Sequence, residues 1–343
     1  MSTFATAPAF ADWIPAAADE YLHSPTGDDQ WPWKDTWYFS LRDEESDQAL
    51  NMHMTISANR EPGTRVGVSI SRGAQVSTQV LKSATGKDPA VVGNSLCTLQ
   101  LLRPTGDSEH ELRMIGELEG VCDYDITLRG QHFASYWDTM FPGFYAVGKT
   151  GQTYSHYEQM VVAEGWICWS GGPAVPFSGV GWRDRGWGRR KTEKMFDSGW
   201  DLVGAVLPDR SVFSFIALRN HERTADSPMP VGGWRSDTGV LAPLVAGTYH
   251  KDAMAWPTRL ALEFSDGFTL VATKVRDSIS LPAAWHDAEV SKDGAGVAPN
   301  MRDYWAVFAD EQGREFPLFT NHCYTHRVDV FRGAEFAAAA ANR

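Results

Sequence analysis

A twelve-residue stretch near the middle of the chain combines four arginines, four glycines, two tryptophans, one aspartate and one valine, from Gly179 to Arg190. A carboxyl group set among indoles can act as a general acid, because apolar surroundings raise its pKa. Guanidinium groups bind carboxylates and phenolates, often through two parallel hydrogen bonds. The stretch therefore indicates acid–base chemistry on a small molecule, or an arginine–aspartate network that only closes a barrel.

The glycines in this stretch favour a bent strand over a helix, because glycine destabilises a helix and permits close backbone approach. Residues two apart on a strand share a face. This alternation predicts one face with Trp182, Asp184 and Gly186, and an opposite face with Arg183, Arg185 and Trp187. A bulge at Gly186 would turn Trp187 towards Asp184.

The elements that must position this stretch are further short strands. Met52, Met54 and Ile56 alternate with polar neighbours, which is typical of a half-buried strand. Similar apolar runs recur between turn residues at intervals of about 8 to 12 residues, the rhythm of an antiparallel barrel or sandwich. No long capped helical pattern interrupts them. We predict an all-β fold with two antiparallel β-barrel or sandwich domains packed together.

The chain of 343 residues is longer than a domain with a single hydrophobic core usually is. We predict an N-terminal arm at 1–30, a first β domain at 31–150, a second at 151–332 that carries the arginine stretch, and a C-terminal tail at 333–343. An aromatic loop with Pro142 and Gly143 is interpreted as the start of the crossing between the domains.

Composition excludes several classes of protein. The net charge of −12 argues against nucleic acid and anionic membranes as partners. No run of about 18 apolar residues predicts a membrane span. The start lacks the basic and apolar regions of a signal peptide, and the four scattered cysteines are interpreted as reduced thiols, so we expect a cytoplasmic protein.

No cofactor or metal is predicted. The cysteines are too widely spaced for a zinc site, and His322 and His326 would lie about 13 Å apart on a straight strand. The glycine pair Gly171-Gly172 lacks the strand–helix setting of a phosphate loop. No Gly-x-Ser-x-Gly elbow occurs, and Cys168 has no evident partner, so nucleophilic catalysis is not indicated.

Two motifs together resemble a known superfamily. The run His156-Tyr157-Glu158-Gln159 is followed about twenty residues later by Gly179-x-Gly181-x-Arg183-Asp184-x-x-Trp187-Gly188-x-Arg190. This pairing resembles the lipocalin-like superfamily of hydroxyneurosporene synthases (carotenoid 1,2-hydratases), AttH-like bacterial proteins and fungal lipocalin-type Diels–Alderases. The resemblance implies two lipocalin-like halves with an apolar ligand pocket, and action on hydrophobic substrates without metal or organic cofactor.

Arg185 departs from that superfamily pattern, in which histidine usually follows the aspartate. A guanidinium stays charged and cannot shuttle a proton near neutral pH. The departure argues against carotenoid hydration and favours a substrate with a carboxylate or phenolate.

From these patterns we expect Asp184, Glu158 and His326 to be catalytic by exchanging protons. The expected substrate-binding residues supply positive charge, aromatic faces and hydrogen bonds: Arg183, Arg185, Trp187, Trp182, Arg190, Tyr157, His322 and Tyr324. A structural role for each of them remains the alternative at this stage.

The predicted function is a cofactor-independent lyase, hydratase or isomerase. It would act by acid–base catalysis on a hydrophobic aromatic or terpenoid small molecule, and a carboxylated substrate would undergo decarboxylation or elimination. The alternatives are a non-catalytic carrier of a hydrophobic ligand and an assembly module with exposed tryptophans. A homodimer is compatible with the sequence, which does not fix the oligomeric state.

Overall fold

The computed structural model describes residues 15, 17–25, 33–58, 62–103, 111–131, 135–136, 153–189, 198–220, 231–237, 240–252, 256–282, 300–324 and 333–337. β-Strands dominate these residues, and the helix among them is the single turn α1 (Ala17–Glu20). No helix in these ranges is long and apolar enough to cross a membrane. The predicted all-β fold with two lipocalin-like domains is confirmed.

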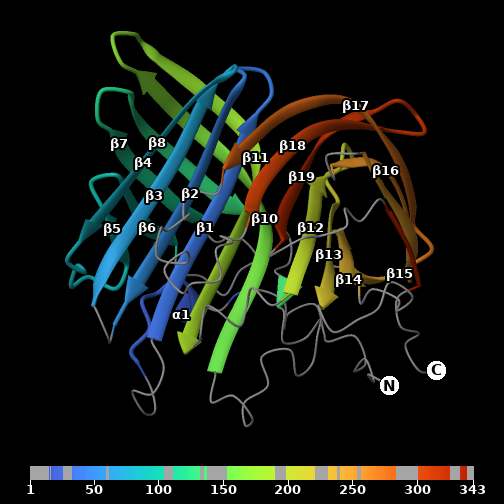
Figure 1. Cartoon of the computed structure of the whole chain (residues 1–343), viewed down its shortest axis with the longest axis horizontal. Helices are drawn as coiled ribbons and strands as arrows, with labels where there is room; N and C mark the ends of the chain where they lie inside the picture. The colour runs from blue at the N-terminus through green and yellow to red at the C-terminus, as the bar shows by residue number, and fades with distance from the viewer. Residues whose placement is uncertain are drawn as a thin grey trace. The chain divides into compact units, whose positions relative to one another are not determined.

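The first sheet contains eleven described strands, and each neighbouring pair is antiparallel (Figure 1). Its order is β4-β3-β2-β1-β11-β10-β8-β7-β6-β5, with β9 beside β10. The strands are β1 (Trp33–Asp43), β2 (Gln48–Ser57), β3 (Gly63–Arg72), β4 (Gln75–Ser83), β5 (Val91–Asn94), β6 (Cys97–Arg103), β7 (Glu111–Leu118), β8 (Cys122–Gly130), β9 (Ser135–Tyr136), β10 (Thr153–Trp169) and β11 (Ala174–Arg189).

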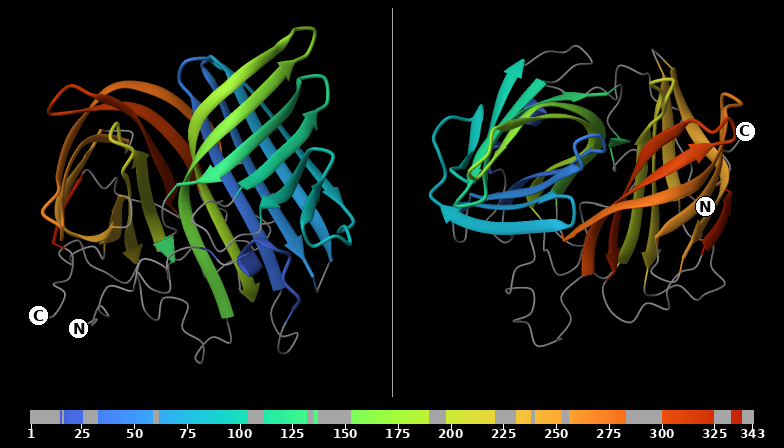
Figure 2. Two further views of the ribbon diagram at one scale, coloured as in Figure 1. Left: turned by 180° about the vertical axis from the view of Figure 1, so that it is seen from behind. Right: turned by 90° about the horizontal axis from the view of Figure 1, so that it is seen from above.

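This first sheet curls round its own core into a barrel (Figure 2). The Asn94 amide of the edge strand β5 donates to the Leu81 carbonyl of the other edge strand, β4. The Gln79 amide of β4 also donates to the Glu119 carbonyl, in the turn between β7 and β8. Inside lie apolar residues from alternate positions of the strands, among them Phe39, Met52, Val68, Met114, Ile126 and Val161. The predicted alternation in β2 is therefore confirmed, with Met52 and Met54 buried in this core.

The second sheet contains nine described strands and closes into a ring, because β14 pairs with both β13 and β15. Its order is β14-β13-β12-β19-β18-β17-β16-β15-β20. The strands are β12 (Ser198–Val206), β13 (Val212–Asn220), β14 (Val231–Asp237), β15 (Val240–Lys251), β16 (Pro257–Phe264), β17 (Thr269–Pro282), β18 (Asn300–Asp310), β19 (Glu315–Tyr324) and β20 (Gly333–Ala337).

The second barrel has its own apolar core, built from residues such as Phe213, Phe215, Leu262 and Phe308. One ion pair is also buried in this unit, since the Lys251 ammonium contacts the Asp201 carboxylate and both side chains are almost fully inaccessible. Burial lowers the pKa of Lys251, although the charge of Asp201 opposes that effect.

The division between the units differs from the sequence prediction. Contacts group Ala11–Lys191 into one unit, so the boundary falls after the arginine stretch and not at residues 150 and 151. The physical reason is pairing: β10 is the antiparallel neighbour of β8, and β11 lies between β10 and β1. The aromatic loop before β10 therefore connects strands of one sheet. In the predicted tail, β20 pairs with β15.

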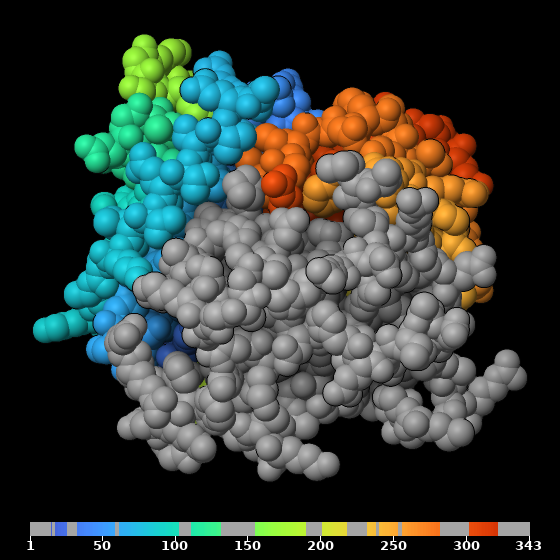
Figure 3. Space-filling model, in the orientation of Figure 1, coloured from blue at the N-terminus to red at the C-terminus, as the bar shows by residue number. Residues whose placement is uncertain are grey.

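The β10–β11 hairpin is the longest in the first barrel and extends to the molecular surface. Its turn, with exposed residues at 170–173, is coloured yellow-green in Figure 3. At the other end of the hairpin, β11 carries the arginine stretch at the centre of the sheet, between β1 and β10.

Candidate active site

β11 places its side chains on two faces, as the alternation predicted. Its pairing with β1 and β10 runs without a register shift from Val180 to Arg189. The bulge considered at Gly186 does not form, so Trp187 stays on the face of the arginines. That face is the barrel interior, because Phe177 of the same strand and Phe39 of β1 belong to the apolar core.

On the interior face, Arg183 is held by a carboxylate from the N-terminal segment. Its Nη2 lies 2.9 Å from Glu20 Oε1 and its Nη1 lies 3.2 Å from Glu20 Oε2. Tyr157 donates to Glu20 Oε1 at 2.6 Å, and Arg183 Nε donates to Gln159 Oε1 at 2.8 Å. The Glu20 side chain is fully inaccessible and that of Arg183 is 3% exposed, so this is a buried, bidentate ion pair.

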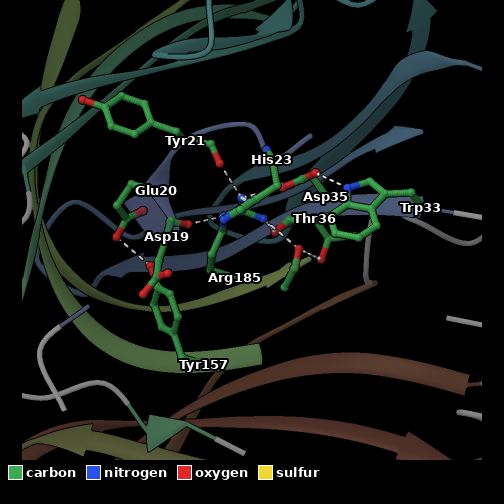
Figure 4. Close-up of polar contacts among 10 residues, drawn as sticks. Asp19, Glu20, Tyr21, His23, Trp33, Asp35, Thr36, Tyr157 and Arg185 are labelled. Carbon is green, nitrogen blue, oxygen red and sulfur yellow. Dashed lines mark hydrogen bonds and ion pairs between the residues drawn. The ribbon is translucent and has the colours of Figure 1, made fainter. Parts of the chain in front are cut away.

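Arg185 forms the second interior network (Figure 4). Its Nη2 lies 2.6 Å from Asp35 Oδ1 and donates to the Tyr21 carbonyl at 2.9 Å. Its Nε donates to the Asp19 carbonyl at 3.0 Å, and its Nη1 to the Gly186 carbonyl at 2.7 Å. The guanidinium also lies 3.9 Å from the centre of the Trp37 ring. Every donor nitrogen of Arg185 is therefore used within the protein.

Asp35 stays ionised in this network. Burial alone would raise its pKa, but the hydrogen bond with His23 and the charge of Arg185 outweigh burial and lower it. His23 in turn stacks on Trp187, with ring centroids 4.6 Å apart and planes 3° from parallel. Arg183, Arg185, Trp187 and Tyr157 thus anchor the N-terminal segment in this structure, and their predicted role in substrate binding stays a prediction.

The opposite face of the same strands carries a histidine and two carboxylates. Glu158 and Asp184 are direct partners across β10 and β11, and His156 lies two residues before Glu158. His156 Nε2 lies 2.9 Å from Asp184 Oδ2 and 3.8 Å from Glu158 Oε1. His156 and Glu158 are buried, whereas the Asp184 side chain is 28% exposed. One imidazole nitrogen therefore faces a buried and an accessible carboxylate.

This cluster continues as a polar row across four strands. In register, His53 of β2 pairs with Tyr38 of β1, Tyr38 with Asp184, and Asp184 with Glu158. The Tyr38 and His53 rings lie 6.0 Å apart, and the Asn51 amide donates to the Tyr38 hydroxyl at 2.8 Å. Four titratable side chains thus occupy one line on the face away from the barrel core.

The charges on the two faces are separated by the strand alternation. Arg183 and Arg185 satisfy Glu20 and Asp35 in the interior, and their side chains point away from Asp184. The Asp184 carboxylate instead contacts His156. This arrangement suits proton exchange, because an imidazole that contacts two carboxylates can pass a proton between them.

The same three residues have a spacing that could hold a metal ion. One ligand atom each from His156, Glu158 and Asp184 lies within 4.8 Å of the others. A shared Zn²⁺ would need ligand distances of about 2.0 to 2.2 Å, so the three groups would close in slightly around it. The sequence patterns did not single out this cluster as a metal site, because the histidine–carboxylate contact depends on the register of β10 and β11.

The remaining predicted site residues lie elsewhere. His322 and Tyr324 belong to β19 of the second barrel, where only their backbone is described, and His322 pairs in register with Asp201. His326 and Arg190 lie outside the described residues. Trp182 is fully buried on the face of Asp184. The structure therefore brings Asp184, Glu158 and Trp182 to one face.

The sequence patterns did not indicate several residues that prove important in the structure. Glu20 and Asp35, which neutralise the two arginines, come from segments that carry no motif. His156 had a visible signal, since His156-x-Glu158 puts two polar side chains on one strand face. Tyr38 gave none, because an aromatic residue in a strand is most often core.

Comparison with known proteins gives the family. A family model described as "Domain of unknown function (DUF7064)" matches residues 16–290. The chain belongs to the DUF7064 family. The match spans the whole first barrel of this DUF7064 protein and continues through β17 of the second. No curated protein sequence matches the chain.

Solved structures are similar to the DUF7064 chain. An AttH-like protein from Nitrosomonas europaea is 15% identical, with a TM-score of 0.55 over 94% of this chain and 99% of that one. Kievitone hydratase from Nectria haematococca is 12% identical, with a TM-score of 0.49 over 84% of this chain and 88% of that one. CghA with Sch210972 is 9% identical, with a TM-score of 0.47 over 96% and 97%. The AttH-like protein confirms the lipocalin-like fold expected from the motifs.

Proposed function

We propose that this protein is an enzyme that catalyses proton transfer to and from a hydrophobic small molecule, as a lyase, hydratase or isomerase. The observation that carries the proposal is the contact of His156 Nε2 with two carboxylates, one buried and one accessible. Asp184 is the group that meets the substrate, because its side chain is 28% exposed while its two partners are buried.

The three groups have distinct roles in this proposal. Asp184 removes a proton from a carbon of the substrate, and His156 takes that proton from Asp184 through Nε2. Glu158 stabilises the imidazolium that forms, since a buried carboxylate nearby favours the charged ring. In an elimination, the stored proton then passes to the leaving hydroxyl group, which departs as water. Hydration is the same sequence in reverse.

The substrate class follows from the rest of the face. Tyr38 and Trp182 flank Asp184 on this face, and both are buried, so they make the surroundings of the Asp184 carboxylate apolar. Arg183 and Arg185 point to the other face, so they do not provide an anion site next to Asp184. We therefore favour aromatic or terpenoid alkenes and alcohols, and a carboxylated substrate only if Arg190 contributes.

The rival function is a carrier that binds a hydrophobic ligand without changing it. The deciding experiment incubates the protein in D₂O with aromatic and terpenoid alkenes and alcohols, including p-coumarate and linalool, and measures deuterium incorporation by mass spectrometry. An enzyme of the proposed kind introduces solvent deuterium at carbon. A carrier leaves every compound unlabelled and retains a bound lipid through purification.

Single substitutions test the role of Asp184 in the deuterium-incorporation assay. Asp184→Asn should lower the rate by about 10² to 10⁴, the usual contribution of a general acid or base, while ligand affinity is retained. Asp123→Asn is the matched control, because Asp123 is an exposed aspartate of β8 in the same sheet. Equal rates for Asp184→Asn and wild type would refute the proposed role of Asp184.

A further inference from the structure

The interior face of the first barrel contains a second site, separate from the Asp184 cluster. Arg183 and Tyr157 converge there on the Glu20 carboxylate, and Gln159 accepts a hydrogen bond from Arg183 beside it. Arg183 supplies two hydrogen bonds in parallel and Tyr157 a third, all to the same carboxylate. Three donors fixed by buried strands are the usual means of recognising a carboxylate.

The donors belong to the barrel and the carboxylate does not. Arg183 lies on β11, and Tyr157 and Gln159 lie on β10, which is its direct neighbour. Glu20 comes from α1, 163 residues away in sequence from Arg183. A helix of one turn is not stable by itself, so α1 depends on these contacts. The barrel thus provides the binding site, and the N-terminal segment provides its occupant.

The N-terminal segment is held mainly by polar contacts. Arg185 binds the carbonyls of Asp19 and Tyr21, and His23 stacks on Trp187. Leu22 is only partly buried where it packs against the apolar core. Segments with few buried apolar contacts open at low free energy compared with the core strands. Residues 17–25 can therefore withdraw while the barrel stays folded, provided that another carboxylate replaces Glu20 at the buried Arg183.

The site also contains a buried hydrogen-bond donor, the side-chain amide of Gln159, that Glu20 does not use. Gln159 is 2% exposed, and its Oε1 accepts from Arg183 Nε, which fixes the orientation of the amide. Its Nε2 is buried and has no hydrogen-bond acceptor among the described residues. A ligand with a second oxygen near its carboxylate would satisfy this donor, which Glu20 does not.

We propose that Arg183, Tyr157 and Gln159 form a binding site for a small carboxylic acid, and that Glu20 occupies it as an internal competitor. A carboxylate ligand with a short apolar chain displaces residues 17–25 and replaces the two Arg183 hydrogen bonds. The inference is independent of the proton chemistry at Asp184, because the two sites lie on opposite faces of β11.

The first test uses Glu20→Ala and two probes, acetate and hexanoate. Thermal unfolding is measured against probe concentration, and apparent affinity is taken from the rise in Tm. Removal of the competitor should raise the apparent affinity for hexanoate by about tenfold or more, because a site is weakened by the fraction of molecules in which it is closed. Hexanol, which lacks the carboxylate, should leave Tm unchanged.

Two further variants test whether the response to hexanoate comes from the Arg183 site. The double variant Glu20→Ala/Arg183→Met should lose the response to hexanoate, whereas Glu45→Ala, which removes an exposed glutamate of the same barrel, should behave as wild type. The proposal is overturned if acetate and hexanoate raise the Tm of Glu20→Ala no more than that of wild type.

A second measurement does not depend on the folding of any variant. Hydrogen–deuterium exchange of wild type is followed in peptides that cover residues 17–25, with and without hexanoate. Displacement of the segment predicts faster exchange there, with no change in peptides from β3. Unchanged exchange in residues 17–25 at hexanoate concentrations that saturate Glu20→Ala would contradict the proposal.

Discussion

Replacement of Arg185 by methionine should destabilise the protein more than any other single change in the arginine stretch. The substitution leaves the Asp35 carboxylate, whose side chain is fully inaccessible, without its cation. Loss of one partner from a buried ion pair costs about 3–5 kcal/mol. The carbonyls of Asp19, Tyr21 and Gly186 also lose a charged donor. Because domains are typically stable by about 5–15 kcal/mol, Arg185→Met should be close to unfolding.

The assay is equilibrium urea unfolding of the full chain, with the midpoint taken for each variant. Arg113→Met is the matched control, because Arg113 pairs with Asp125 in the same sheet and its side chain is 41% exposed. Exposed pairs contribute about 0.2–1 kcal/mol, so this control should change little. Arg185→Met/Asp35→Asn should cost less than the sum of the single variants, by about 0.5–3 kcal/mol.

The dependence on pH gives an independent check of the same pair. The pKa of Asp35 is lowered in the folded state from its ordinary value of 3.8. Its contribution to stability is therefore complete above that value and is lost as the pH falls through the lowered pKa. The wild-type midpoint should decrease below about pH 4, and Asp35→Asn should decrease less. Equal costs for Arg185→Met and Arg113→Met would refute the account of this network.

Three further predictions concern packing and burial. Gly181→Ala should destabilise the first barrel by about 1–3 kcal/mol in the urea assay, because the added Cβ would lie 2.3 Å from Leu41 Cδ2. An unchanged urea midpoint would show that β1 and β11 can move apart to make room for the methyl group. Lys251→Met should cost about 3–5 kcal/mol, because it removes the ammonium that pairs with the buried Asp201 carboxylate. Lys251→Met/Asp201→Leu should recover part of that loss, and no recovery would mean that the pair is not coupled. Burial raises the pKa of the Cys97 and Cys122 thiols to about 12. Both thiols should therefore react with a disulfide reagent at pH 8 about a thousandfold more slowly in the folded protein than in urea. Equal rates in the two conditions would contradict their burial.

The sequence predicted where strands form and which face each side chain occupies, but it did not predict which side chains contact one another. Alternation in β11 put Asp184 opposite to Arg183 and Arg185, and the structure has this arrangement. It did not reveal that Glu20 and Asp35 neutralise these arginines, because the pairs are separated by 163 and 150 residues. Such contacts depend on how the barrel closes and leave no local pattern.

The boundary between the barrels was missed for a related reason. Proline, glycine and aromatic residues before β10 are typical of any long connection, and local composition does not show which sheet the next strand joins. The contact of His156 with Asp184 likewise required the register of β10 and β11. Short-range periodicity fixes the face of a side chain, whereas its neighbour is fixed by long-range strand pairing.

The central claim is that Asp184, backed by His156 and Glu158, exchanges a proton with the substrate. The most direct measurement is the rate of solvent deuterium incorporation by Asp184→Asn relative to wild type and Asp123→Asn, at saturating concentration of one labelled compound. We predict a loss of about 10² to 10⁴ for Asp184→Asn and none for Asp123→Asn. Incorporation by Asp184→Asn at the wild-type rate would contradict the claim.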